Sequence, residues 1–68
     1  MKRSEQILRT AKAVFARSNY RSSTTSAIAA EAGVSEPLIY RYYPSKKQLF
    51  LAVLDDVNRR ILQRWDAI

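Results

Sequence analysis

The chain contains no cysteine and no histidine, and these absences exclude several kinds of chemistry. Without cysteine it has neither a disulfide framework nor a thiolate nucleophile. Without histidine it lacks the commonest catalytic base and the commonest metal ligand. The six acidic side chains are scattered, and no two stand at a spacing typical of a catalytic carboxylate pair. We therefore expect no enzymatic activity, no metal site and no cofactor.

Long apolar stretches are also missing from the sequence. No run approaches the length of about 18 apolar residues that a membrane-spanning helix needs. Lys2 and Arg3 stand near the N-terminus, but the uninterrupted apolar stretch of a secretory signal does not follow them. With 68 residues the chain is long enough for one domain at most. These features predict a single cytoplasmic domain.

Negative charge is scarce in most of the chain. Residues 1–54 carry nine Lys and Arg side chains against three Glu, whereas residues 55–68 carry three Arg against three Asp. The net charge of +6 therefore belongs entirely to the first 54 residues. A basic field of this kind suits a polyanion, since it adds affinity and speeds encounter. Composition alone leaves an ordinary solvated basic surface as an equal alternative.

Glycine occurs once, at Gly33, where it separates two short helical patterns. Thr24 is a typical N-cap for a helix over about 25–32, and Gly33 supplies the positive φ that ends it. Ser35 is the cap of a second helix over about 36–43, with Pro37 in its first turn, where the missing N–H costs little. Pro44 then breaks that helix. Within it, Ile39 points inward together with Tyr42 or Tyr43.

A longer helix is predicted on each side of this pair. The first covers about residues 4–18, and we expect Asn19 to close it in the left-handed conformation. The last begins near Lys46, because Ser45-Lys46-Lys47-Gln48 has the form of a capping box. Its apolar stripe continues through the C-terminal residues, and we expect Leu62, Trp65 and Ile68 to lack cover within the chain and to require a partner. The apolar side chains predicted to pack are Ile7, Leu8, Ala11, Val14, Phe15, Ile28, Ala29, Ala32, Phe50, Val53, Leu54, Val57 and Ile61.

The pattern predicts an all-α fold: a three-helix, homeodomain-like helix-turn-helix domain followed by a longer fourth helix. Two short helices about a glycine turn, carried by a basic domain, form the layout that places the second helix in a DNA major groove. We take residues 24–43 as the helix-turn-helix motif.

At these residues the chain resembles the tetracycline-repressor (TetR-like) family of bacterial transcriptional regulators. The resemblance covers about residues 4–54 and departs from the family in having Asn19 where glycine is usual and Tyr43 where phenylalanine is usual. The matching segments are Ile7-Leu8, Val14-Phe15, Tyr20, Thr24, Ile28-Ala29, Ala32-Gly33-Val34-Ser35, Ile39-Tyr40-Arg41-Tyr42-Tyr43, Pro44-Ser45-Lys46 and Leu49-Phe50.

The resemblance implies sequence-specific binding of double-stranded DNA by a regulator, most often a ligand-controlled repressor. It makes residues 1–54 the DNA-binding domain. Residues 55–68 begin the helix that leads to an absent domain for dimerisation and small-molecule binding. The full-length protein is then expected to be a homodimer on a palindromic operator, and this piece to be a monomer.

The resemblance also implies which side chains contact DNA. Phosphate contacts fall to Thr24, Tyr40, Tyr42 and Lys46, with Lys47 in support, and base edges to Ser26, Ser35, Glu36, Pro37 and Leu38. Thr25 and Arg41 complete the predicted site. Other readings stay open, because Thr24 and Ser35 are caps in any case, Glu36 is a favourable first-turn acid, and Arg41 is equally typical of a solvated surface.

The alternative function is that of a cationic amphipathic module for an anionic membrane surface or a protein partner. A membrane role is disfavoured because the long apolar stripe lies in the charge-balanced helix. A protein-binding bundle explains that stripe but leaves the tyrosines and lysines of 40–47 without a role.

Overall fold

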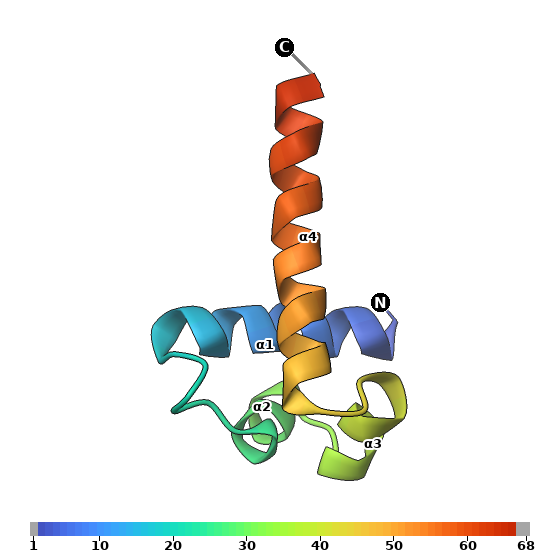
Figure 1. The fold of residues 1–68 in the computed structure, drawn as a ribbon. Helices are drawn as coiled ribbons and strands as arrows, with labels where there is room; N and C mark the ends of the chain where they lie inside the picture. The colour runs from blue at the N-terminus through green and yellow to red at the C-terminus, as the bar shows by residue number, and fades with distance from the viewer. Residues whose placement is uncertain (1, 67–68) are drawn as a thin grey trace.

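Four helices account for the fold in the computed structural model, which describes the backbone of residues 2–66 and the side chains of residues 2–59. They are α1 (Arg3–Arg17), α2 (Thr25–Ala32), α3 (Glu36–Tyr42) and α4 (Lys46–Asp66), and residues 2–66 form no strand. Figure 1 shows α1, α2 and α3 gathered around the first turns of α4, while the rest of α4 extends away from them. The predicted all-α architecture with a longer last helix is confirmed.

Each helix contributes one large side chain that is fully buried in the core. These are Ile7, Ile28, Ile39 and Leu49, each with an exposed fraction of 0%. Full burial of an aliphatic side chain of this size stabilises a fold by about 1.5–3 kcal/mol. The four residues therefore join the helices into a single unit around one centre.

The ends of the short helices follow the sequence closely. The hydroxyl of Thr24 accepts a hydrogen bond from the Ala27 N–H at 3.0 Å, and the hydroxyl of Ser35 accepts one from the Leu38 N–H at 3.3 Å. Ser45 caps α4 in the same way, with 3.1 Å to the Gln48 nitrogen. Gly33 has a φ of 71°, as the left-handed residue that ends α2. The three predicted caps and the glycine turn are confirmed.

The prediction for Asn19 is wrong. In residues 2–66 Gly33 has the only positive φ, so Asn19 does not close α1 in the left-handed conformation. Its side chain instead supports the following turn, because Oδ1 accepts from the Ser22 N–H at 2.8 Å. The backbone carbonyl of Asn19 also accepts from the Ser23 hydroxyl, at 2.5 Å. An asparagine can serve a turn through its side chain as well as through left-handed backbone, and here the first use prevails.

The apolar stripe of α4 meets the core at a register different from the predicted one. Leu49 and Val53 are buried, whereas Leu54 is 43% exposed. Figure 1 shows α4 crossing α1 steeply. Leu54 directly follows the buried Val53, about 100° further around the helix, and so lies outside the packed side. The predicted exposure of Leu62, Trp65 and Ile68 and the predicted packing of Ile61 lie outside the described side chains. Among the helices searched within the described residues, none is long and apolar enough to cross a membrane.

Candidate nucleic-acid interface

Helix α3 buries little of its own surface. Of its seven residues only Ile39 is buried, while Tyr40 and Tyr42 are 44% and 45% exposed. Arg41 between them is also exposed. A helix that turns two tyrosines and an arginine outward offers hydroxyl groups and a guanidinium, and these can bind an anion or a base edge.

The inward aromatic residue is Tyr43, at the C-terminal end of α3. It packs against the core, and its hydroxyl donates to the Ser4 carbonyl of α1 at 3.3 Å. Burial, and secondarily the negative charge of Asp56, raise the pKa of the Tyr43 hydroxyl above its usual value. This settles the choice between Tyr42 and Tyr43 and leaves the Tyr42 hydroxyl at the surface.

A chain of hydrogen bonds joins the first turns of α2 and α3. Thr25 is only 7% exposed, and its Oγ1 donates to Oε2 of Glu36 at 2.8 Å. The same Oγ1 lies 2.8 Å from the Tyr40 hydroxyl oxygen. Three predicted site residues are therefore held together in the structure. Thr25 is shown to be a buried connector between the two helices, and its hydroxyl is fully engaged.

Lys46, in the first turn of α4, is held by backbone carbonyls. Its Nζ donates to the carbonyl oxygens of Tyr20 at 2.8 Å and Ser23 at 3.1 Å, and it lies 4.3 Å from the centre of the Tyr20 ring. These partners explain how a cation is accommodated in a first helical turn, where the helix dipole disfavours positive charge. An ammonium has three N–H groups, so one stays available for an outside acceptor.

The aromatic ring below Lys46 is part of a packed cluster. The ring centre of Tyr20 lies 4.7 Å from that of Phe50 and 6.0 Å from that of Phe15, and the Phe15 and Phe50 centres are 5.2 Å apart. Tyr20 thus folds back on the apolar stripe of α1. The cluster fixes the loop whose carbonyls hold Lys46.

All twelve predicted site residues lie between Thr24 and Lys47, at the end of the molecule formed by α2, α3 and the start of α4 (Figure 1). Glu36, Leu38 and Lys46 are half-buried, and Thr25 is buried. The exposed members are Thr24, Ser26, Ser35, Pro37, Tyr40, Arg41, Tyr42 and Lys47.

Two polar residues that support this region were missed from the sequence. Gln6 of α1 donates from Nε2 to the Ala32 carbonyl at 2.7 Å and so satisfies a free acceptor at the end of α2. Ser23 is 2% exposed, and its carbonyl helps to hold Lys46. No local motif marks either residue, because both act through contacts distant in sequence.

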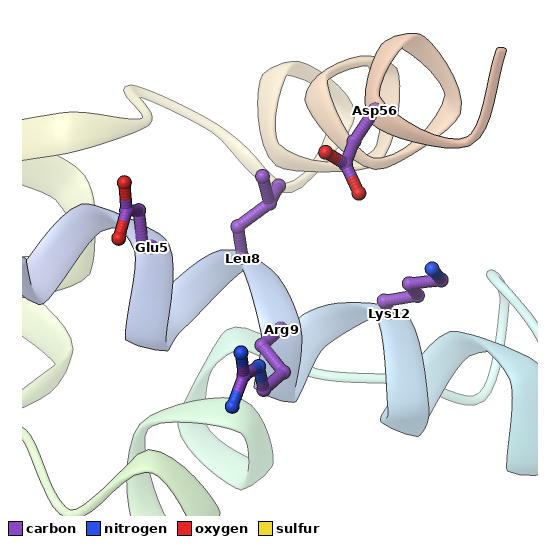
Figure 2. A pocket seen from close by; sticks show the side chains of 5 residues that line it. All are labelled: Glu5, Leu8, Arg9, Lys12 and Asp56. Carbon is purple, nitrogen blue, oxygen red and sulfur yellow. The ribbon is translucent and has the colours of Figure 1, made fainter. Parts of the chain in front are cut away.

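A hollow lies between α1 and α4 and is lined by Glu5, Leu8, Arg9, Lys12 and Asp56. Figure 2 shows Asp56 projecting from α4 towards α1, which carries the other four. None of the predicted DNA-contacting residues lines this hollow. Within the described residues no group of three or more acidic, histidine or cysteine side chains could hold a metal ion.

Comparisons with known proteins agree with this geometry. The family model for bacterial regulatory proteins of the tetR family matches residues 7–53. Nucleoid occlusion factor SlmA of Pasteurella multocida is 51% identical over 41 residues, which are 60% of this chain and 21% of that protein. The same factor from Shewanella loihica is 42% identical over 45 residues, 66% of this chain and 23% of that protein.

A solved structure extends the comparison to three dimensions. A TetR-like transcriptional regulator from Rhodococcus sp. RHA1 superposes with a TM-score of 0.87 at 36% identity, over 90% of this chain and 33% of that one. The chain therefore spans about a fifth of the length of the two SlmA relatives and a third of the solved regulator.

Proposed function

Because the chain belongs to the tetR family of bacterial regulatory proteins, we propose that it binds double-stranded DNA in a sequence-specific manner through α3. In this proposal α3 enters the major groove and α2 braces it across the phosphate backbone. A DNA-binding regulator acts where the chromosome lies, which places the protein in the bacterial cytoplasm. It acts by binding and catalyses no reaction.

The exposed outer face of α3 is the observation that carries the proposal. A helix of seven residues that buries only Ile39 contributes little to the core, yet both of its ends are fixed. Ser35 caps the beginning, and the Tyr43 hydroxyl joins the end to α1. A rigid, well-supported helix with an exposed polar face suits the reading of a groove, because its side chains are positioned before contact.

Phosphate contacts are proposed for Thr24, Tyr42, Lys46 and Lys47. Thr24 stands at the N-terminus of α2, where free N–H groups and the helix dipole favour an anion. Tyr42 offers an exposed hydroxyl on a stiff ring, and Lys46 keeps one N–H beyond its two carbonyl partners. Because every nucleotide carries a phosphate, these contacts fix the docking and give no sequence preference.

Base contacts are proposed for exposed or half-exposed side chains at the starts of α2 and α3. Pro37 and Leu38 can pack on a thymine methyl group, and Ser26 and Ser35 can exchange hydrogen bonds with base edges. Arg41 is exposed in the last turn of α3 and can bind either a phosphate or a guanine edge. Glu36, Thr25 and Tyr40 are joined by hydrogen bonds and are considered together below.

For the whole protein we propose a ligand-controlled repressor. Residues 1–54 form the DNA-binding unit, and residues 55–68 connect it to the parts of a regulator that dimerise and bind a small-molecule effector. A dimer presents two copies of α3 to a palindromic operator with half-sites at one helical turn or more. The uneven charge supports this division, because the whole net charge of +6 lies in residues 1–54.

Selection from a random duplex library tests the proposal. The 68-residue chain, used alone and as two copies joined by a flexible linker, is expected to enrich a short recurrent half-site. Leu38→Ala should change the enriched bases, whereas Tyr42→Phe should weaken binding to all sequences alike. If neither form enriches any sequence, the proposed function is wrong, and vesicles of anionic lipid and protein partners become the targets to examine.

A further inference from the structure

The hydrogen bonds among Glu36, Thr25 and Tyr40 form a chain with a direction. Thr25 Oγ1 stands in the middle, 2.8 Å from a carboxylate oxygen of Glu36 and 2.8 Å from the Tyr40 hydroxyl. Thr25 is only 7% exposed, so water does not compete freely for its hydroxyl. Both neighbours are therefore the effective partners of this group.

The direction follows from counting protons. A threonine hydroxyl has one proton to donate, and a carboxylate can only accept. The Thr25 proton is therefore donated to Glu36. The contact between Thr25 and Tyr40 then needs a proton from the tyrosine, so the Tyr40 O–H donates to Thr25 Oγ1. Glu36 thereby fixes the direction of the whole chain without touching Tyr40.

This direction limits what the Tyr40 hydroxyl can offer to DNA. Its single proton is used, so its oxygen keeps only the capacity to accept. The phosphates and deoxyriboses of a duplex carry acceptors and no hydrogen-bond donors. Donors are found only on the bases, and in the major groove these are the amino groups of adenine and cytosine.

We propose that Glu36 is a positioning residue that, through Thr25, makes Tyr40 a reader of adenine or cytosine amino groups and withholds it from the phosphate backbone. The inference rests on the proposed DNA-binding function and refines the assignment of Tyr40 within that site. Tyr40 is 44% exposed, and Glu36, one turn earlier in α3, is half-buried. The Tyr40 hydroxyl oxygen and the Glu36 carboxylate therefore contribute to one accepting surface on α3.

The test compares base preference among variants. A change in hydrogen-bond direction alters the preference at one base position, whereas a change in charge alters the affinity for all sequences alike. Library selection and affinity measurements use the parent chain, Tyr40→Phe, Glu36→Gln and Glu31→Gln. Glu31 is the matched control. It is a glutamate of α2 that pairs with Arg17 at 2.6 Å, and it takes no part in the hydrogen bonds among Glu36, Thr25 and Tyr40. Thr25→Val removes the connecting hydroxyl at nearly constant volume, and Thr25→Ser keeps it. Thermal unfolding of each variant verifies that it is folded.

The parent half-site is expected to contain one position that requires adenine or cytosine. Tyr40→Phe should lower the preference for the amino base there about 3- to 10-fold, the value of one hydrogen bond, with other positions unchanged. Glu36→Gln should relax the same position towards guanine and thymine, because an amide can donate as well as accept and so lets Tyr40 turn its proton outward. Thr25→Val should also relax the base preference at this position. Thr25→Ser and Glu31→Gln should both keep the preference of the parent.

Two results would overturn the inference and leave DNA binding intact. One is a Tyr40→Phe variant that binds every sequence more weakly by the same factor, as expected for a phosphate donor. The other is a Glu36→Gln variant whose base preferences equal those of the parent and of Glu31→Gln. Failure of the parent to enrich any half-site, both alone and as two joined copies, would overturn the proposed function, and this inference with it.

Discussion

Tyr43 shows how one side chain joins the exposed helix to the core. Burial, and secondarily Asp56, raise the pKa of its hydroxyl above the usual value of 10.0, so folding favours the protonated form. A group whose pKa is higher in the folded state contributes stability that is fully present below the unfolded pKa and is lost as pH rises through the folded pKa. We therefore expect the parent to lose stability above pH 10, and Tyr43→Phe to lack this part of the loss.

Urea unfolding of the parent and Tyr43→Phe at a series of pH values measures this difference. Near neutral pH the variant should be less stable by about 0.5–1 kcal/mol, because it lacks the hydrogen bond to the Ser4 carbonyl. The two stabilities should converge at alkaline pH. Parallel curves across the alkaline range would show that Tyr43 does not titrate with folding.

Other residues show where reasoning from the sequence reached its limit. Thr24, Ser35 and Gly33 were predictable because a cap and a left-handed turn are decided within a few residues. Lys46 and Glu36 were understood only in part, since their partners lie on other segments: Lys46 bonds to carbonyls 23 and 26 positions away, and Glu36 to a hydroxyl 11 positions away. The sequence predicted a role in DNA contact for both side chains, and their partners within the protein became known from the fold.

The turn between α2 and α3 depends on a backbone conformation that glycine adopts at low cost. Gly33 has a φ of 71°, and a Cβ added there would meet no atom within 4 Å. The expected cost of Gly33→Ala is therefore conformational rather than steric, about 1–2 kcal/mol. That loss lowers the midpoint of thermal unfolding by about 4–8 °C per kcal/mol in a domain of this size. Gly33→Asn should cost less, because asparagine visits the left-handed region more readily.

Circular dichroism at the helical band during heating measures both variants. An alanine variant as stable as the parent would mean that the turn adopts another conformation.

The helices themselves were well predicted, with ends within one residue for α1, α2 and α3, because capping residues and apolar periodicity coincide. The packing face of α4 was not, since a stripe of apolar residues does not reveal which side of the helix meets its neighbours. Leu49 and Val53 lie on the buried side, whereas Leu54, about 100° around the helix from Val53, is exposed.

At the scale of the whole molecule, charge and shape divide the chain in the same way. The basic excess belongs to residues 1–54, which contain α1, α2, α3 and the start of α4, while the rest of α4 is charge-balanced and extends away from that layer (Figure 1). Lys46 and Lys47 stand at the junction, at the same end of the molecule as α3. A duplex that approaches α3 therefore meets these cations and not the far end of α4.

The salt dependence of DNA binding tests this local arrangement of charge. Each phosphate neutralised by a lysine or arginine contributes about −0.9 to the slope of log affinity against log salt concentration. Lys47→Gln should therefore make the slope about 0.9 less steep and weaken binding at all sequences alike. Arg59→Gln removes the same charge from the charge-balanced part of α4, where Arg59 pairs with Asp55 at 3.1 Å, and should leave the slope unchanged. Equal effects of the two substitutions would mean that attraction follows net charge alone, and the cations beside α3 would then have no special place in docking.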